Sequence, residues 1–480
     1  MVSSTLPSVP TDYDWEAFRA NAHRTIDFIV DYHKKLQSRE IPVMSSCEPG
    51  DVRRALPEMA PEQPVPWEST MNVVENVIVP TMTHWQHPDF YAYFPSLGVP
   101  SALLGEIMAS AMNQPGFSWV ASPAATELEL HVMEWIHEAF EMPESMSWKS
   151  TGGSVIQPSA TEGVIVAQVS ARTRKLAELP DASIDSFVTY YSDQSHFCVE
   201  KASKVLGISH LRKISSIYDE STGNYALNVA ELESTIAADK ANGLTPFFIS
   251  ANFGATGVCA VDDIPAVAAI AKANKIWLHI DAAYAGVVRV VPEFRDQFQG
   301  MDLVDSIIIN GSKWFNLNMG ASFFFFTQRE YVVRALNASG VYLDNKHTGN
   351  VMDLKDYQLG LGRPFRSLKI FCAMQSLGLE GFRNVIRRHV ILAKHLASLL
   401  APHVEIVREV DFGLVCFRMK DSTDQDNMAL LERLHQVENI HLVHTVTAKH
   451  GVILRISLSY PQLSENDMNE LAAKIVRSLS

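Results

Sequence analysis

The sequence predicts an α/β protein built on a mostly parallel sheet with helices on both faces. Between about residues 100 and 370, short β-rich runs that are apolar throughout alternate with helical stretches. Strands of this kind are typical of parallel sheets, because helices bury both of their faces. Strands are expected at 186–191, 246–250, 276–280, 306–309 and 322–326, and helices at 123–140, 160–176 and 264–273.

An amphipathic helix is expected ahead of this sheet. Trp15, Phe18 and further apolar residues up to Leu36 recur at spacings of three, four and seven, and Asp12 or Asp14 could cap the helix start. The proline-rich stretch 41–66 that follows is expected to be a loop or arm. A lone helix with one apolar stripe must bury that stripe against something, which in a homodimer is often the partner subunit.

A smaller α+β domain is expected at the other end of the chain. A helix over 383–400 precedes short strands at 405–410, 413–418 and 452–457, and a last helix begins at Glu465. The predicted division is therefore an N-terminal helical segment over 1–99, a large domain over 100–369 and a small α+β domain over 370–480.

The composition excludes several classes of protein. The 480 residues are 47% hydrophobic and 20% charged, and a net charge of −14 argues against binding to nucleic acid or to an anionic membrane surface. The five cysteines are scattered without a Cys-x-x-Cys pair, so neither a disulfide framework nor a metal site is expected, and a reducing cytoplasm is favoured. Neither a signal peptide nor an apolar run of the ~18–20 residues that span a bilayer is recognisable.

Four chemically capable residues follow predicted strands: His196, Thr256, Asp281 and Lys313. Ligands of open α/β sheets gather beyond the carboxyl ends of the strands. Taken singly, a strand-end aspartate is often a turn residue, a lone lysine is usually solvated and a lone histidine is usually structural. Their coincidence at one edge of one sheet favours a shared site.

Lys313 and Asp281 fit the chemistry of pyridoxal 5′-phosphate (PLP). A lysine amine can form an imine with the PLP aldehyde, and a carboxylate can keep the pyridine nitrogen protonated, so that the ring accepts electrons. Ser159 is placed as a helix N-cap with Glu162 three residues later, which leaves the N–H groups of Ala160 and Thr161 to face an anion such as the phosphate. A plain capped helix explains this spacing equally well.

Rings are abundant near the expected site. An imidazole at position 196 could stack on a pyridine ring and also hydrogen-bond a substrate carboxylate. Aromatic side chains are dense from Trp85 to Pro95. They could form ordinary core, or they could wall a pocket for an aromatic side chain.

Taken together, the motifs resemble those of the group II PLP-dependent decarboxylases, specifically the aromatic L-amino acid decarboxylases. The resemblance runs nearly end to end. It implies a fold-type I (aspartate-aminotransferase-like) large domain with a mostly parallel seven-stranded sheet, and a homodimer whose active sites lie at the subunit interface. The matching segments are His-Pro-Asp-Phe-Tyr-Ala-Tyr-Phe-Pro (87–95), 116–129, Ser-Asp-Gln-Ser-His (192–196), Trp-Leu-His-Ile-Asp-Ala-Ala-Tyr-Ala-Gly (277–286), Asn-x-x-Lys-Trp (310–314) and Arg-Pro-Phe-Arg-Ser-Leu-Lys (363–369).

The resemblance also implies a role for individual residues. Those implied to be catalytic are Lys313, Tyr342, His196 and Asp281. Those implied to hold the cofactor are Ala160, Thr161, His196, Thr256, Asp281, Asn310, Ser312 and Lys313. Those implied to contact the substrate, with Phe117 reaching in from the neighbouring subunit, are Trp85, Tyr93, Phe94, Pro95, Ser96, Phe117 and Gly362.

Departures from the family pattern concern the substrate and the lid. Ser312 stands where relatives usually have histidine, Leu354 replaces a tyrosine, and the lid between Tyr342 and Asp353 is slightly short. Gly362 leaves room for an indole or catechol ring.

The resemblance implies that a lid phenol such as Tyr342 protonates the substrate α-carbon and yields an amine, whereas relatives with phenylalanine there release an aldehyde. The prediction is therefore decarboxylation of an aromatic amino acid of the tryptophan, dopa, tyrosine or phenylalanine type. An aldehyde synthase is the alternative on the same scaffold, and a non-catalytic binding or structural protein is the alternative from another class.

Overall fold

The computed structural model describes residues 14–220, 222–337, 340, 347, 349 and 351–479. The chain divides into two compact units. The first runs to Phe90 and includes Asn439–His441, and the second comprises Tyr91–Glu438 together with the chain from Leu442 onward. The three-part division at residues 99 and 369 remains a prediction.

The first unit is helical. Asp14 caps helix α1, since its Oδ1 accepts hydrogen bonds from the backbone N–H groups of Glu16 (3.0 Å) and Ala17 (2.9 Å), as the sequence predicted. The helix buries Leu36, while Trp15 and Phe18 stay 67% and 62% exposed. The helices of this unit include α1 (Trp15–Gln37), α2 (Asp51–Ala55) and α3 (Trp67–Val73), followed by the π-helical turn η1 (Val74–Ile78) and the short 3₁₀ turn η2 (Val79–Thr81).

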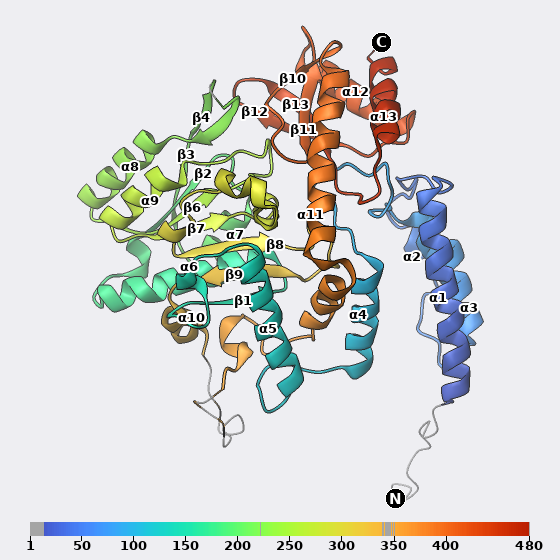
Figure 1. The fold of residues 1–480 in the computed structure, drawn as a ribbon, viewed down its shortest axis with the longest axis horizontal. Helices are drawn as coiled ribbons and strands as arrows, with labels where there is room; N and C mark the ends of the chain where they lie inside the picture. Colours follow the sequence, from blue (N-terminus) through green and yellow to red (C-terminus); the bar gives the residue numbers. More distant parts are fainter. Residues whose placement is uncertain are drawn as a thin grey trace, which may run out of the picture. The chain divides into compact units, whose positions relative to one another are not determined.

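A seven-stranded sheet forms the centre of the second unit (Figure 1). Its strand order is β1-β9-β8-β7-β6-β2-β3, and β9 is antiparallel to both of its neighbours while the remaining pairs are parallel. The predicted mostly parallel, seven-stranded sheet is therefore confirmed. The strands are β1 (Gly153–Gln157), β2 (Phe187–Ser192), β3 (His210–Ile214), β6 (Thr245–Asn252), β7 (Trp277–Asp281), β8 (Ser306–Asn310) and β9 (Ser322–Phe326).

Successive side chains of each strand point to opposite sides of the sheet, so apolar strands place apolar side chains on both faces, and helices cover both of them. In β8, Ile308 packs into one buried cluster, and Ile307 and Ile309 pack into another. Helices that contribute to the first cluster are α6 (Ala160–Glu178), α7 (Cys198–Val205) and α10 (Arg329–Leu336), and those that contribute to the second include α5 (Pro123–Ala139), α8 (Val229–Ala241) and α9 (Ile264–Ala273).

Helix α11 (Ser367–Leu400) connects this sheet to the C-terminal part of the chain. It starts well before the predicted position 383, and its helical geometry is interrupted at Gly378, where φ is +61°. Helix α4 (Pro100–Met112) packs against α11 so closely that a Cβ on Gly105 would lie 2.5 Å from the Lys369 Cα. Glycine is needed at position 105 for this approach, and α4 itself was not predicted.

An antiparallel sheet of four strands follows, with the order β10-β11-β13-β12. Its helices α12 and α13 start with capping boxes formed by Thr423 with Asp426 and by Ser464 with Asp467. The predicted α+β character of this region is confirmed. The elements are β10 (Val404–Ile406), β11 (Leu414–Met419), α12 (Asp424–Gln436), β12 (Val443–Thr447), β13 (Gly451–Ser457) and α13 (Glu465–Arg477), and the hairpin β4 (Ser216–Asp219) and β5 (Asn224–Leu227) forms a separate small sheet.

Two further features concern the helices and the cysteines. Within the described part of the chain, none of the helices has the length and apolar character needed to cross a membrane. All five cysteines carry free thiols.

We expect acid to destabilise the second unit through His389 of α11. This imidazole is fully buried; its Nδ1 accepts a hydrogen bond from Trp314 Nε1 (2.9 Å) and its Nε2 lies 2.9 Å from the Tyr460 carbonyl oxygen. Burial lowers the pKa of His389 from 6.5 to about 4. An unfolded histidine binds a proton near pH 6.5, so the unfolded chain is protonated first as the pH falls. The contribution of His389 is therefore present above pH 6.5, and about 3 kcal/mol is lost between pH 6.5 and 4.

The measurement is urea unfolding at pH 7 and at pH 4 for the wild type and for His389→Gln. The difference in unfolding free energy between the two pH values should be smaller in the variant by about 3 kcal/mol. An unchanged difference would show that His389 does not titrate as its burial requires.

Candidate active site

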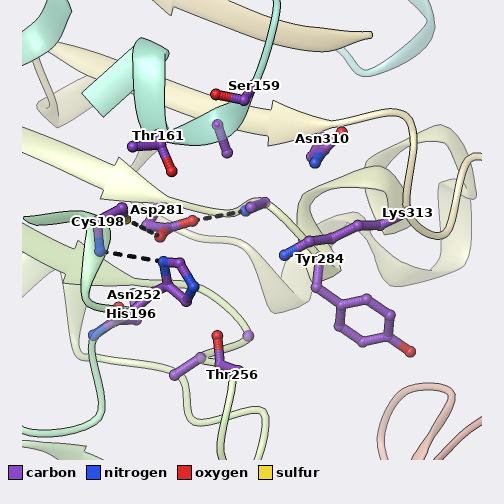
Figure 2. A pocket seen from close by; sticks show the side chains of 14 residues that line it. Ser159, Thr161, His196, Cys198, Asn252, Thr256, Asp281, Tyr284, Asn310 and Lys313 are labelled. Atoms are coloured by element: carbon purple, nitrogen blue, oxygen red, sulfur yellow. Dashed lines mark hydrogen bonds between the residues drawn. The ribbon is translucent and has the colours of Figure 1, made fainter. Parts of the chain in front are cut away.

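A pocket opens at the carboxyl ends of β2, β6, β7 and β8 and at the start of helix α6 (Figure 2). Parallel strands bring these ends together, so residues far apart in the sequence become neighbours. The lining residues are Ser159, Ala160, Thr161, His196, Cys198, Asn252, Gly254, Ala255, Thr256, Asp281, Ala283, Tyr284, Asn310 and Lys313.

Lys313 lies in a tight turn that follows β8. Its backbone N–H donates to the Asn310 carbonyl (3.1 Å), and Gly311 is required beside it because a Cβ there would lie 2.7 Å from the Phe323 ring. Figure 2 shows the Lys313 amine pointing into the pocket, toward the side where Asp281 and His196 lie. Burial lowers the pKa of this amine, and the Asp281 carboxylate opposes that effect. The unprotonated amine is the form that can act as a nucleophile, and a lowered pKa increases the share of this form.

Asp281 is the last residue of β7, and its carboxylate is held at both oxygens. Oδ1 accepts a hydrogen bond from the Ala283 N–H (3.0 Å), and Oδ2 lies 3.8 Å from the Cys198 thiol, which can donate to it. Burial raises the pKa of that thiol well above its usual value, so the sulfur keeps its proton. The carboxylate is thus oriented before any ligand arrives.

His196 follows β2 and presents a neutral ring. Its Nδ1 accepts a hydrogen bond from the Cys198 backbone N–H (3.2 Å), which places the ring proton on Nε2. Burial lowers the pKa of His196; the Asp281 carboxylate counteracts this, and the Lys313 amine adds to the lowering. Near neutral pH the ring is therefore an uncharged donor and a flat stacking surface.

The start of helix α6 offers an anion-binding site. Ser159 is the N-cap, and its hydroxyl accepts a hydrogen bond from the Glu162 N–H (3.2 Å), as predicted. In a capping box the Glu162 carboxylate would accept from the Ser159 backbone N–H. Here it accepts a hydrogen bond from the Ser159 hydroxyl instead (3.3 Å). Ala160 and Thr161 line the pocket at the first turn, where free N–H groups and the helix dipole favour a negative charge.

The structure brings together most of the residues predicted to hold a cofactor. Seven of them line this one pocket: Ala160, Thr161, His196, Thr256, Asp281, Asn310 and Lys313. Ser312 does not line it, since its buried hydroxyl donates to the Asn318 carbonyl (3.1 Å) and accepts from the Ala321 N–H (3.2 Å). The Ser312 side chain therefore stabilises the turn that carries Lys313. Tyr342 lies outside the described residues.

The predicted substrate-binding residues are placed less closely. Phe94 stacks on the lining residue Tyr284 with ring centroids 3.7 Å apart, and its ring lies 5.2 Å from the Lys313 Nζ. Tyr93 has a positive φ of 58° and is 49% exposed, whereas Trp85 belongs to the first unit. The others that are not among the lining residues are Pro95, Ser96, Phe117 and Gly362.

Sequence reasoning missed several lining residues. Cys198 and Asn252 are the most informative of them, because Cys198 contacts both His196 and Asp281, and Asn252 pairs in register with Asp281 on the adjacent strand. The rule that strand ends converge could have found Asn252, which ends β6. Tyr284 lies three residues after Asp281 in a motif that was recognised, but the motif alone does not tell which way its ring points.

The donor set fits PLP. A lysine amine, a fixed carboxylate, a flat neutral ring and a helix N-terminus for a phosphate line one pocket, and each complements a different part of that molecule. The fold and this pocket define a PLP-dependent enzyme of the fold-type I class.

Comparison with known proteins gives the family. The pyridoxal-dependent decarboxylase conserved domain matches residues 49–420. Phenylacetaldehyde synthase of Arabidopsis thaliana is 36% identical over 97% of this chain and 96% of its own length. Aromatic-L-amino-acid decarboxylase of Rattus norvegicus is 37% identical over 97% of this chain and 99% of its own. The crystal structure of Catharanthus roseus tryptophan decarboxylase in complex with L-tryptophan matches with a TM-score of 0.91 and 35% identity, covering 98% of this chain and 100% of that one. The chain belongs to the pyridoxal-dependent decarboxylases and is a carboxy-lyase.

Proposed function

We propose that this enzyme decarboxylates aromatic L-amino acids and releases the corresponding arylalkylamine and CO₂. The observation that carries the proposal is that Lys313, Asp281 and His196 line one pocket, in a chain with full-length relatives that are named for aromatic amino acids. An aromatic substrate side chain also has suitable neighbours, since Phe94 and Tyr284 stack beside Lys313.

Each residue has a part in this proposal. Bound PLP supplies an electron sink for the bond to the departing carboxylate. Asp281 would hold a proton at the pyridine nitrogen of bound PLP, and the neutral His196 ring would offer a stacking surface for the cofactor and an Nε2–H donor for the substrate carboxylate. Lys313 would supply the amine that attaches the cofactor, and Ala160, Thr161 and Asn310 would hold its phosphate.

The last proton transfer decides the product. We assign delivery of a proton to the substrate α-carbon to the Tyr342 hydroxyl, and steps of this kind typically contribute ~10²–10⁴-fold. The second candidate function is aldehyde formation, in which O₂ takes part in place of that protonation and ammonia and peroxide are released. It is retained because one of the similar relatives is named phenylacetaldehyde synthase.

A substrate panel separates the two functions. Purified enzyme with PLP is given tryptophan, tyrosine, dopa, phenylalanine, 5-hydroxytryptophan and, as a non-aromatic control, glutamate. We expect CO₂ and amine in equal amounts from at least one aromatic substrate and none from glutamate. Peroxide and ammonia in amounts equal to CO₂ would assign the aldehyde function instead, and no CO₂ from any aromatic substrate would refute both.

We also propose a homodimer in the reducing cytoplasm. Trp15 and Phe18, which belong to the apolar stripe of α1, are mostly exposed in the single chain, and this suits burial against a second copy. Phe117 would then complete the substrate pocket of the neighbouring subunit. Free cysteines are consistent with a reducing compartment. Sedimentation at micromolar concentration should give the mass of two chains, and a monomer would contradict this.

A further inference from the structure

The loop that brings Thr256 to the pocket is fastened by side chains from distant parts of the second unit. It leaves the sheet at Phe253 and closes at Val261 through an isolated β-bridge. Inside it, the N–H groups of Gly254 and Ala255 both donate to the Ala260 carbonyl at 2.9 Å. This internal bonding shapes the turn, but it leaves the carbonyls at 257, 258 and 259 to be satisfied from outside.

Three successive carbonyls of this loop accept hydrogen bonds from three different elements. The Gly257 carbonyl accepts from Arg455 Nε of β13 (2.7 Å). The Val258 carbonyl accepts from Arg408 Nη1, which lies in the segment between β10 and β11 (3.1 Å). The Cys259 carbonyl accepts from Asn224 Nδ2 of the hairpin (3.3 Å). Two guanidinium groups of the C-terminal α+β region, one on β13 and one between β10 and β11, therefore bind this loop.

Both guanidinium groups are buried, each with 3% of the residue exposed. Arg408 has a carboxylate partner, since its Nη2 donates to Asp411 (2.7 Å). Arg455 forms no ion pair with the residues that the structure describes. Its buried charge is stabilised by the hydrogen bond to the Gly257 carbonyl and by the Phe94 ring, whose centroid lies 5.1 Å from the Arg455 Cζ. A buried cation is costly unless it is well bonded, so a loop that needed only a hydrogen-bond donor could use a neutral amide, as it does at residue 259.

Charged donors form shorter and stronger bonds than neutral ones, and two of them on adjacent carbonyls restrict a backbone more than an amide would. The restricted residues directly follow Thr256, which lines the pocket. We propose that Arg408 and Arg455 are positioning residues that hold the 254–260 loop so that Thr256 contacts the bound cofactor. Through them the C-terminal sheet takes part in building the cofactor site, although neither arginine lines it.

Arg408 is the cleaner residue to test, because Arg455 also contacts Phe94, which neighbours Lys313. The proposal rests on the proposed function, so the readout is affinity for PLP itself. Apoprotein of the wild type, Arg408→Gln, Thr256→Ala and the double variant is titrated with PLP, and the dissociation constants form a double-mutant cycle. When Thr256 is present, we expect Arg408→Gln to weaken PLP binding about 10-fold, which is the scale of one lost charged hydrogen bond. In the Thr256→Ala background, the same substitution should weaken PLP binding by less than about 3-fold.

Arg418→Gln is the matched control. Arg418 lies on β11 of the C-terminal sheet and, like Arg408, donates to backbone carbonyl oxygen, but its acceptors are His450 and Ser422, which lie outside the loop. We expect its affinity for PLP to equal that of the wild type. Equal losses from Arg408→Gln in both Thr256 backgrounds, or an equal loss from Arg418→Gln, would overturn the proposal and reduce Arg408 to a structural role.

A second variant and the wild-type titration keep the test decisive. If Arg408→Gln fails to fold, Arg408→Lys retains the charge and one donor, and it should lie between the wild type and Thr256→Ala in affinity; an affinity below that of Thr256→Ala would contradict the proposal. If wild-type apoprotein does not bind PLP, the proposed function fails before the loop is tested. Binding without coupling to Thr256 refutes the loop proposal alone.

Discussion

Replacing Lys313 with alanine should lower the rate of decarboxylation by about 10³-fold or more. The Lys313 amine lines the pocket and burial lowers its pKa, so the substitution removes the group that we propose attaches PLP and carries a proton. The measurements are turnover with the best aromatic substrate and the visible absorbance of PLP bound to the protein. The absorbance of the lysine-bound cofactor should be lost in the variant.

Two comparisons make this result specific. Lys313→Arg keeps a positive charge but cannot attach the cofactor, so it should be as inactive as Lys313→Ala. Lys272→Ala removes an exposed lysine of α9 and should leave turnover unchanged. Retention of more than about a tenth of wild-type activity in Lys313→Ala would contradict the assignment, since a covalent role is worth far more than tenfold.

Removing the guanidinium of Arg363 should destabilise the second unit by about 3–5 kcal/mol. Its Nη2 pairs with the Glu129 carboxylate and donates to the Ile156 carbonyl (3.2 Å), while Nη1 donates to Gln358 Oε1 (2.8 Å). The side chains of both ionic partners are at most 5% exposed. Arg363→Met therefore leaves a buried carboxylate without its counter-charge. The free energy of unfolding in urea at pH 7 measures the loss.

An exposed ion pair provides the control for this effect. Arg334 and Glu330 lie 3.0 Å apart on helix α10, with side chains 54% and 68% exposed. Arg334→Met should cost about 0.5 kcal/mol or less, because solvent screens the pair. Equal losses of stability in the two variants would show that burial adds nothing to the Arg363–Glu129 pair.

Much of the second unit could be predicted because most central strands of its large sheet are apolar and buried. The run 322–326, for example, has no polar face, and the structure buries all of it as β9. The convergence of Asp281, His196 and Lys313 was also predictable, since parallel strands bring their carboxyl ends to one edge. The N-cap at Ser159 followed from its local sequence, because capping depends on residues only three positions apart.

Features that depend on long-range contacts were not predictable. Gly378 interrupts the pattern of α11 and concealed its first turns, and α4 depends on the close approach of Gly105 to that helix. The hydrogen bonds of the Ser312 hydroxyl to the Asn318 carbonyl and the Ala321 N–H depend on how the chain folds after β8, which the residues around position 312 do not specify. The proposed roles of Arg408 and Arg455 depend on carbonyls that lie 150 and 198 residues away in sequence.

Cys198 has a consequence for anyone who wishes to redesign this enzyme. Its amide N–H donates to His196 Nδ1 and its thiol donates to Asp281 Oδ2, so one residue supports two pocket-lining side chains through different parts of its structure. The amide is present whatever the side chain, except in proline. Substitution at position 198 can therefore change the surroundings of the Asp281 carboxylate, and through it the electron-withdrawing strength of the pyridine ring of bound PLP. The His196 imidazole would keep its tautomer, because the backbone N–H that bonds it remains. The side chain at position 198 therefore affects Asp281 without affecting the hydrogen bond to His196.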